Sequence, residues 1–165
     1  MRFLKRQAGF SLIELIVVIV IVGILSAIVA VNFNQSNASL QYGALVQKLK
    51  IDIGYAQQLA ATEGKGTRVY IDQSNNRYYL KWDDGSYIQQ PVGEDDFIVQ
   101  LGTGDFSEVQ ITGTDFSSGR LDFNTSGMPL NAGNTFTGQL TVVTLNSAKR
   151  IKISANTGFL EIEDL

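Results

Sequence analysis

The chain begins with MRFLKRQAGFSLIELIVVIVIVGILSAIVAV, residues 1–31. Its first nine residues carry three basic side chains, Arg2, Lys5 and Arg6, and no acid. Residues 15–31 are 17 residues with nothing more polar than a single serine. As a helix this run would be ~25 Å long, near the hydrocarbon thickness of a bilayer. We therefore expect a membrane-inserted helix, and the basic residues before it place the N-terminus in the cytoplasm.

Two common kinds of N-terminal segment fit this pattern less well. A secretory signal peptide has a short apolar core followed by a small-residue cleavage site, whereas Gly9 precedes the core here. An ordinary signal anchor does not need Glu14, the one charged residue of the apolar segment. A carboxylate costs up to ~3 kcal/mol at the middle of a bilayer and is by default a functional-site hypothesis. Glu14 is therefore a candidate functional residue.

The sequence GFSLIEL, residues 9–15, with its basic leader, resembles the prepilin cleavage and methylation motif of type IV pilins and type II secretion pseudopilins. The resemblance implies that prepilin peptidase cuts after Gly9 and that the new amine of Phe10 is methylated. It also implies that Glu14 forms an assembly salt bridge with the Phe10 amine of a neighbouring subunit. A buried carboxylate needs a partner of opposite charge, which agrees with that role.

An amphipathic stripe continues the helix beyond the apolar run. Apolar residues recur at steps of three and four at Leu45, Leu49, Ile53, Ala56, Leu59 and Ala60. We expect one helix from about Phe10 to Thr62, stopped by Gly64. Residues 10–33 would be its transmembrane or filament-core part, and residues 34–62 its amphipathic continuation. A break over residues 32–39 is the alternative, although the Pro that many family members have near Val31 is missing here.

Beyond residue 66 the sequence predicts strands. Alternating segments rich in Val, Ile and Tyr are separated by turn residues. The predicted strands cover residues 67–72, 77–82, 87–90, 97–101, 108–111, 120–124, 139–145, 150–154 and 159–163. Short strands of this spacing indicate an antiparallel β domain. The expected fold class is α+β, with a long N-terminal helix packed on a C-terminal antiparallel β-sheet domain over residues 67–165, a pilin-like arrangement.

Composition argues against several chemistries. The chain has no His and no Cys, so the usual nucleophile and base pairs are missing. Without the leader, ten basic residues face 16 acidic ones, a formal charge of −6, whereas nucleic acids need a positive field. The acidic turns at residues 83–84 and 94–96 match no EF-hand spacing. We expect no enzyme, no cofactor, no metal and no bound nucleic acid.

Two later stretches sharpen the resemblance. LDFNTSGMP, residues 121–129, is similar to the strand and glycine turn of the minor pseudopilin H group. RIKIS and TGFL, residues 150–154 and 157–160, are similar to the C-terminal strands of that group and of FimT-like minor pilins. The resemblance favours a structural minor pilin or pseudopilin subunit of a type IV pilus or type II secretion filament, assembled through its N-terminal helix. The turn at residues 126–129 is otherwise expected to be a plain turn.

Two alternatives stay open. The first is a major type IV pilin, although major pilins often have a C-terminal disulfide loop and a Pro in the first helix, and this chain has neither. The second is a DNA-binding minor pilin for DNA uptake, which would show a basic C-terminal patch. Lys149, Arg150 and Lys152 are basic, but the acidic residues 161–164 follow, and strand alternation would divide the basic residues between two faces.

The resemblance also implies partners and a location. Residues 1–9 would be a leader peptide that prepilin peptidase removes. The other partners would be pilin or pseudopilin subunits, the inner membrane before assembly, and an assembly platform protein. The chain would cross the bacterial inner membrane once, with its N-terminus cytoplasmic and its β domain periplasmic, before it joins a filament.

Overall fold

The computed structural model describes residues 12–165, and within them the side chains of residues 12–26 and 39–165. The chain divides into two compact units, Met1–Asn37 and Ala38–Leu165. The second unit contains the C-terminal part of the helix and every described strand.

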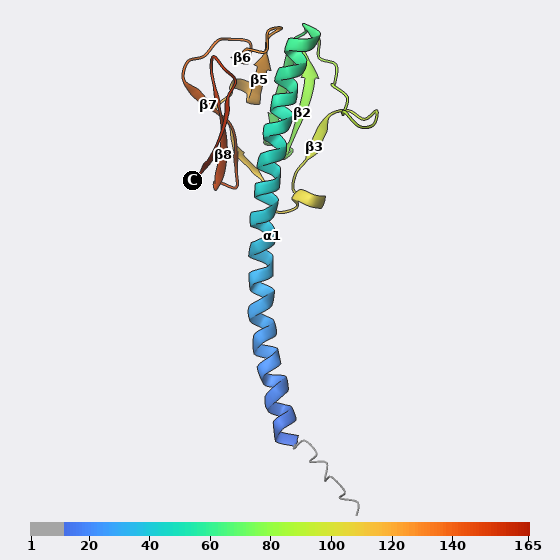
Figure 1. Ribbon diagram of the computed structural model, residues 1–165, viewed down its shortest axis with the longest axis vertical. Coiled ribbons are helices and arrows are strands. Elements are labelled where there is room, and N and C mark those ends of the chain that lie inside the picture. The colour runs from blue at the N-terminus through green and yellow to red at the C-terminus, as the bar shows by residue number, and fades with distance from the viewer. Residues whose placement is uncertain (1–11) are drawn as a thin grey trace, which may run out of the picture. The chain divides into compact units, whose positions relative to one another are not determined.

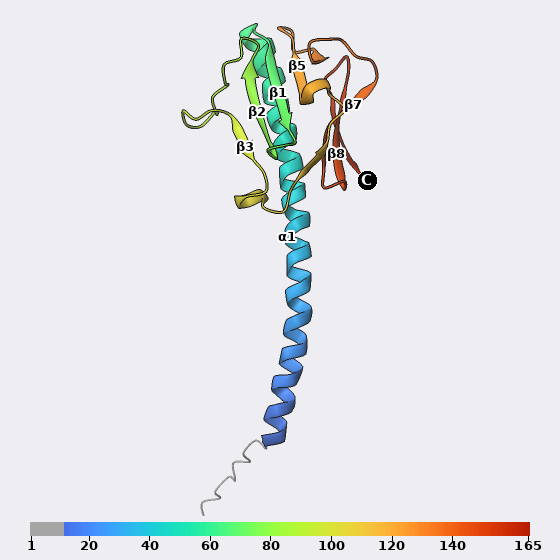
Figure 2. The ribbon, with the colours of Figure 1, turned by 180° about the vertical axis from the view of Figure 1, so that it is seen from behind.

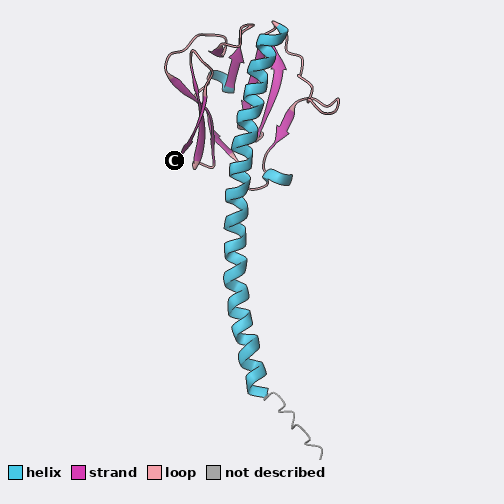
Figure 3. Cartoon of the chain, viewed as in Figure 1, coloured by secondary structure: helices cyan, strands magenta, loops and turns pink. Residues whose placement is uncertain are grey.

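Helix α1 runs from Leu12 to Glu63 and is helical through residues 32–39 (Figure 3). Both prolines of the chain, Pro91 and Pro129, lie outside it, so every residue of α1 keeps its backbone donor. The helix ends where Gly64 takes a φ of +63°, a left-handed conformation that glycine adopts without steric cost. The predicted glycine stop is confirmed.

The strands of residues 12–165 form two antiparallel sheets. The strands are β1 (Thr67–Asp72), β2 (Arg77–Trp82), β3 (Ile98–Gln100), β4 (Ile111–Gly113), β5 (Arg120–Phe123), β6 (Pro129–Asn131), β7 (Gln139–Leu145), β8 (Lys149–Ser154) and β9 (Leu160–Asp164), and short 3-10 helices lie at Gly104–Phe106 and Ser117–Gly119. One sheet has the order β3-β2-β1-β5-β6 and the other β4-β7-β8-β9. The α+β class is confirmed, and the antiparallel β domain consists of two sheets.

Two strand predictions need correction, and one strand, β6, was not predicted. Residues 87–90 form only isolated bridges, Lys81 with Tyr87 and Gln89 with Asp96, because the chain turns at a proline directly afterwards. The strand predicted at residues 108–111 begins only at Ile111, because the amide of Val109 donates to the carbonyl of Phe106 and that of Gln110 donates to Oδ1 of Asn146. The plain turn expected at residues 126–129 leads into β6, where proline is tolerated because β6 is an edge strand.

The second unit is built on the buried face of α1. Five side chains at steps of four, four, three and four residues are almost fully buried: Leu45, Leu49, Ile53, Ala56 and Ala60. They share one apolar core with Val69 and Leu80 of the five-stranded sheet and with Val143, Ile151 and Ile153 of the four-stranded sheet. Figures 1 and 2 show β2 and β3 on one side of this part of the helix and β7 and β8 on the other. The predicted stripe is confirmed, except that Leu59 is only partly buried.

A helix side chain ties α1 to a turn of each sheet. The Nε2 of Gln57 donates to the carbonyl of Gly127, in the turn before β6, at 2.9 Å, and to that of Thr157, in the turn before β9, at 3.4 Å. At the start of β1, the buried hydroxyl of Thr67 donates to the carbonyl of Ala56 at 2.9 Å. These bonds satisfy polar groups beside the core and fix the helix against both sheets.

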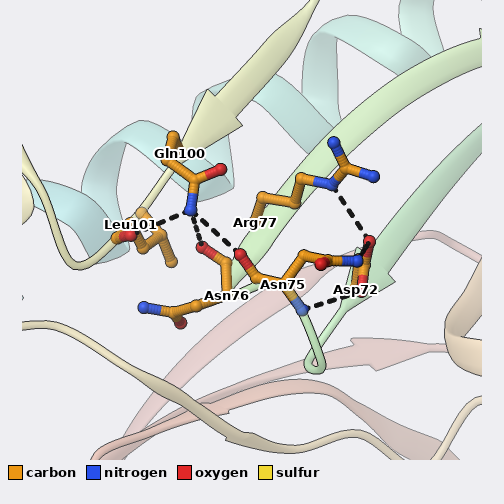
Figure 4. A network of polar contacts seen from close by, with 6 residues as sticks. All are labelled: Asp72, Asn75, Asn76, Arg77, Gln100 and Leu101. Carbon is orange, nitrogen blue, oxygen red and sulfur yellow. Dashed lines mark hydrogen bonds and ion pairs between the residues drawn. The ribbon is translucent and has the colours of Figure 1, made fainter.

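The turn between β1 and β2 is held by a polar network (Figure 4). The carboxylate of Asp72 accepts from the backbone and side-chain amides of Asn75 at 3.1 and 2.8 Å and from Nε of Arg77 at 3.0 Å. Hydrogen bonding from Asn75, followed by that from Arg77, lowers the pKa of Asp72 although burial opposes the shift. The side-chain amide of Gln100 donates to three carbonyls, those of Asn75, Asn76 and Leu101. The turn is thereby joined to the end of β3.

Asn76 extends this network to the other sheet. Its Nδ2 donates to the carbonyl of Val109 at 3.0 Å, and its Oδ1 accepts from the amide of Ile111 in β4 at 2.8 Å. The residue has a φ of 49°, which asparagine tolerates better than most residues. One turn residue of the five-stranded sheet therefore fixes the edge of the four-stranded sheet.

Gly119 provides a test of this packing. Its φ is +61°, and a Cβ atom would lie 2.5 Å from the carbonyl oxygen of Ile71. We expect Gly119→Ala to lower the free energy of unfolding by about 2–4 kcal/mol, because backbone strain and overlap add. Gly85→Ala is the control, since Gly85 also has a positive φ but open space around it, and it should cost only about 1 kcal/mol. Chemical unfolding followed by circular dichroism measures both, and equal losses would contradict the packing described.

Candidate functional site

The candidate site predicted from the sequence lies at the N-terminus. Gly9 and Phe10 lie outside the described residues. Glu14 lies in the first turn of α1 and is exposed. An acidic side chain in the first turn is favoured by the helix dipole.

The helix surface from Leu15 to Leu25 is apolar on all sides. Each large apolar side chain is 45–60% exposed: Leu15, Ile16, Val17, Val18, Ile19, Val20, Ile21, Val22, Ile24 and Leu25. The hydroxyl of Ser26 donates to the carbonyl of Val22 at 2.7 Å, so this polar group is satisfied within the helix. A helix that is apolar all round is typical of one that becomes buried among other helices or in lipid. No helix among the described residues combines the length and the apolar character that a membrane crossing needs.

The basic residues that could have formed a DNA-binding patch pair with acids on β9. Nζ of Lys152 and Nε of Arg150 lie 2.7 and 2.5 Å from the same oxygen of Glu163, and Lys149 pairs with Asp164. The three cations on β8 are thus paired with two carboxylates on the neighbouring strand, and Arg150 and Lys152 share one of them. This pairing weakens the local positive field on which the DNA-binding alternative depended.

The acidic turns do not gather into a metal centre. Within residues 12–165, no group of three or more His, Cys, Asp or Glu side chains is placed to hold a metal ion. Asp84 accepts instead from Nζ of Lys65 at 2.7 Å and from the hydroxyl of Ser86 at 2.6 Å. The hydrogen bond from Lys65, followed by those from Ser86, holds the pKa of Asp84 well below its usual range.

A buried polar cluster in the core was missed by the sequence analysis. Asp52 is buried beside the apolar stripe of α1 and accepts from the hydroxyl of Tyr78 at 2.5 Å and from Nζ of Lys48 at 2.8 Å. Burial, and secondarily the charge of Asp52, raises the pKa of Tyr78 far above its ordinary value, so Tyr78 remains a donor. The spacing of Lys48 and Asp52, four residues apart on a helix, is the signal that could have revealed the cluster. Its position between helix and β2 indicates a structural role.

Comparison with known proteins decides the nature of the N-terminal segment. Residues 4–30 match the family model of the prokaryotic N-terminal methylation motif. The chain carries a prepilin-type N-terminus. Such an N-terminus implies processing by prepilin peptidase, assembly with other pilin subunits and an N-terminal anchor in the inner membrane.

Similarity over the rest of this prepilin-type chain is looser. The minor pseudopilin EpsH from the Type 2 Secretion System of Vibrio cholerae has a solved structure with a TM-score of 0.47 and 15% sequence identity. The superposition covers 74% of this chain and 95% of that one. No curated protein matches the chain by sequence.

The paired charges on β8 and β9 predict an acid-dependent loss of stability. Hydrogen bonds from Arg150 and Lys152 hold the pKa of Glu163 at about 2, below its ordinary 4.5. Because the pKa is lower in the folded state, the stabilisation is present above pH about 4.5 and is lost as the pH falls towards about 2. In Glu163→Gln the midpoint of unfolding should therefore fall less over this interval than in the wild type.

The matched control is Glu108→Gln, because the side chain of Glu108 makes no ion pair among residues 12–165. It should keep the wild-type dependence on pH. High salt should weaken the Glu163 effect, since the pair is partly exposed. Identical pH profiles for Glu163→Gln and the wild type would rule out this role.

Proposed function

We propose that the chain is a structural minor pilin or pseudopilin subunit of a type IV pilus or type II secretion filament. The observation that carries this proposal is the match of residues 4–30 to the N-terminal methylation motif. The absence of Cys and of a Pro near Val31 favours a minor subunit over a major type IV pilin. The role is assembly rather than catalysis, in keeping with a sequence that has no His or Cys.

The proposal divides the chain into four parts. Prepilin peptidase removes residues 1–9, and the new amine of Phe10 is methylated. Residues 10–33 lie in the inner membrane before assembly and in the filament core afterwards, with the N-terminus cytoplasmic. Residues 34–62 continue the helix, and residues 67–165 form the periplasmic β domain that the filament displays. The basic leader and the exposed apolar surface of α1 support this order.

Glu14 is the residue that we assign to filament assembly. In the membrane its carboxylate lies among apolar side chains, where an ionised group is costly. The cut after Gly9 creates an amine at Phe10, so a salt bridge between Glu14 of one subunit and Phe10 of the next removes that cost. An assembly platform protein would bring the subunits together.

Processing is the first expected result. Mass spectrometry of the mature protein should find an N-terminus at Phe10 that carries one methyl group. Gly9→Leu should block the cut and leave the leader in place, whereas the control Gly23→Ala should be processed normally. An intact leader on the wild-type protein in cells with active prepilin peptidase would refute the assignment.

Loss of the carboxylate should separate insertion from assembly. Glu14→Val should stay in the membrane fraction at the wild-type level, because an apolar side chain suits that environment. Its incorporation into filaments should fall at least about tenfold, since a pair worth several kcal/mol is lost. The neighbouring change Ile13→Val is the control and should assemble normally. Quantitative immunoblots of both fractions measure the effect, and normal assembly of Glu14→Val would remove this role.

A further inference from the structure

A groove of about 420 Å³ lies beside the last turns of α1, entirely within the second unit. One wall is a single face of the helix, which presents Tyr55, Leu59 and Glu63 at steps of four residues. The rest of the lining consists of Trp82 at the end of β2, residues 87–90 and Asp96. This volume is in the range of sites that bind small ligands or single anchoring side chains.

The lining is aromatic and held in place. The ring of Tyr55 stacks on that of Phe97, with centroids 6.1 Å apart and planes 23° from parallel. Ile88 is 2% exposed, and its amide donates to the carbonyl of Leu80 at 3.1 Å. The segment that carries Tyr87 is therefore fixed to β2, and the groove is formed before anything binds in it.

The rim of the groove is negatively charged. Glu63 and Asp96 are exposed, and neither carboxylate makes an ion pair or a side-chain hydrogen bond with another residue of the described part of the chain. The nearby Lys65 is already paired with Asp84 at 2.7 Å. Lys81 lies against the ring of Tyr87 but pairs with neither carboxylate. Two carboxylates without an ion pair favour a cation at this rim.

The chain's own lysines show which chemistry these rings accept. Nζ of Lys65 lies 4.8 Å from the centre of the Trp82 ring, and Nζ of Lys81 lies 4.1 Å from the centre of the Tyr87 ring. In the first case a carboxylate, that of Asp84, completes the site for the ammonium group. The groove likewise contains aromatic rings and carboxylates. No cation of the described part of the chain forms an ion pair with Glu63 or Asp96.

We propose that this groove docks a partner protein through a lysine or arginine side chain, which lies against the aromatic walls and pairs with Glu63 and Asp96. The long stem of such a side chain can lie along the rings of Tyr55 and Trp82, and its charged end suits the carboxylates of the rim. The groove uses no residue of the N-terminal segment, so this proposal is tested independently of processing and filament assembly.

The fluorescence of Trp82 reports binding directly, because the chain has one tryptophan. The full-length protein in non-ionic detergent is titrated with the peptide acetyl-Gly-Arg-Gly-Arg-Gly-amide. A matched peptide with citrulline in place of arginine has nearly the same shape without the charge. We expect saturable binding of the arginine peptide, and at least about tenfold weaker binding of the citrulline peptide, since charge-assisted and cation–π contacts are lost.

Paired variants separate the groove from the overall charge of the protein. Glu63→Gln combined with Asp96→Asn should weaken the binding of the arginine peptide at least about tenfold, because both rim charges are removed. Glu94→Gln combined with Asp95→Asn removes the same charge from the loop that contains Asp96, outside the lining, and should change the affinity by no more than about twofold. All four side chains are exposed, and circular dichroism checks that both variants stay folded.

Three results would overturn the proposal. They are equal binding of the two peptides, equal weakening by the two double variants, and no saturable change of Trp82 fluorescence in the folded wild type. Maltotriose serves as a neutral probe for the same aromatic walls. If maltotriose binds more tightly than the arginine peptide, and the Glu63/Asp96 variant leaves that binding unchanged, the groove is a saccharide site and the assignment to a basic side chain is wrong.

Discussion

The second unit depends on one packing interaction, the burial of a narrow face of α1 against two sheets at once. Leu45, Leu49, Ile53, Ala56 and Ala60 are the residues that make it. Strands of three residues, such as β3, β4 and β6, bury too little surface to be stable by themselves. They persist because the helix gives both sheets a common apolar layer. The two alanines keep the helix side of that layer thin near its end, where the hydroxyl of Thr67 reaches the backbone of the helix.

Polar side chains then select one arrangement of these apolar surfaces. Apolar contacts alone are non-directional, so they would tolerate a helix that slides or rotates. Gln57 fixes it to a turn of each sheet, and the buried pair of Asp52 and Tyr78 fixes it to β2. Near the other end of this face, the hydroxyl of Tyr42 donates to the carbonyl of Glu108 and accepts from Asn146. A displaced helix would leave the buried groups of Asp52 and Tyr78 unsatisfied, at a cost of about 1–3 kcal/mol each.

The sequence predicted the features that depend on local pattern, and it missed those that depend on distant contacts. The apolar stripe of α1 and the bounds of β1, β2 and β7 follow from periodicity and turn residues. The late start of β4 depends on Asn146, whose side-chain oxygen accepts a hydrogen bond from the amide of Gln110. No local sequence pattern shows this contact. The division into two sheets depends on which strands pair. The groove at Trp82 unites residues of the helix and of the segment after β2, so only the folded chain displays it. Of the candidate site, the motif at Gly9, Phe10 and Glu14 was readable because its residues lie within six positions of the chain.

The chain joins a prepilin-type N-terminal segment to a β domain. We propose that the processed chain is a minor member of an assembly of prepilin-type proteins. The most direct measurement is the amount of the processed chain relative to other prepilin-type proteins in complexes purified from membranes and sheared filaments through a tag on its C-terminus. The account predicts a chain that begins at Phe10, is recovered with several such proteins, and is much scarcer than the most abundant of them. Recovery as the dominant subunit, or without any other prepilin-type protein, would contradict it.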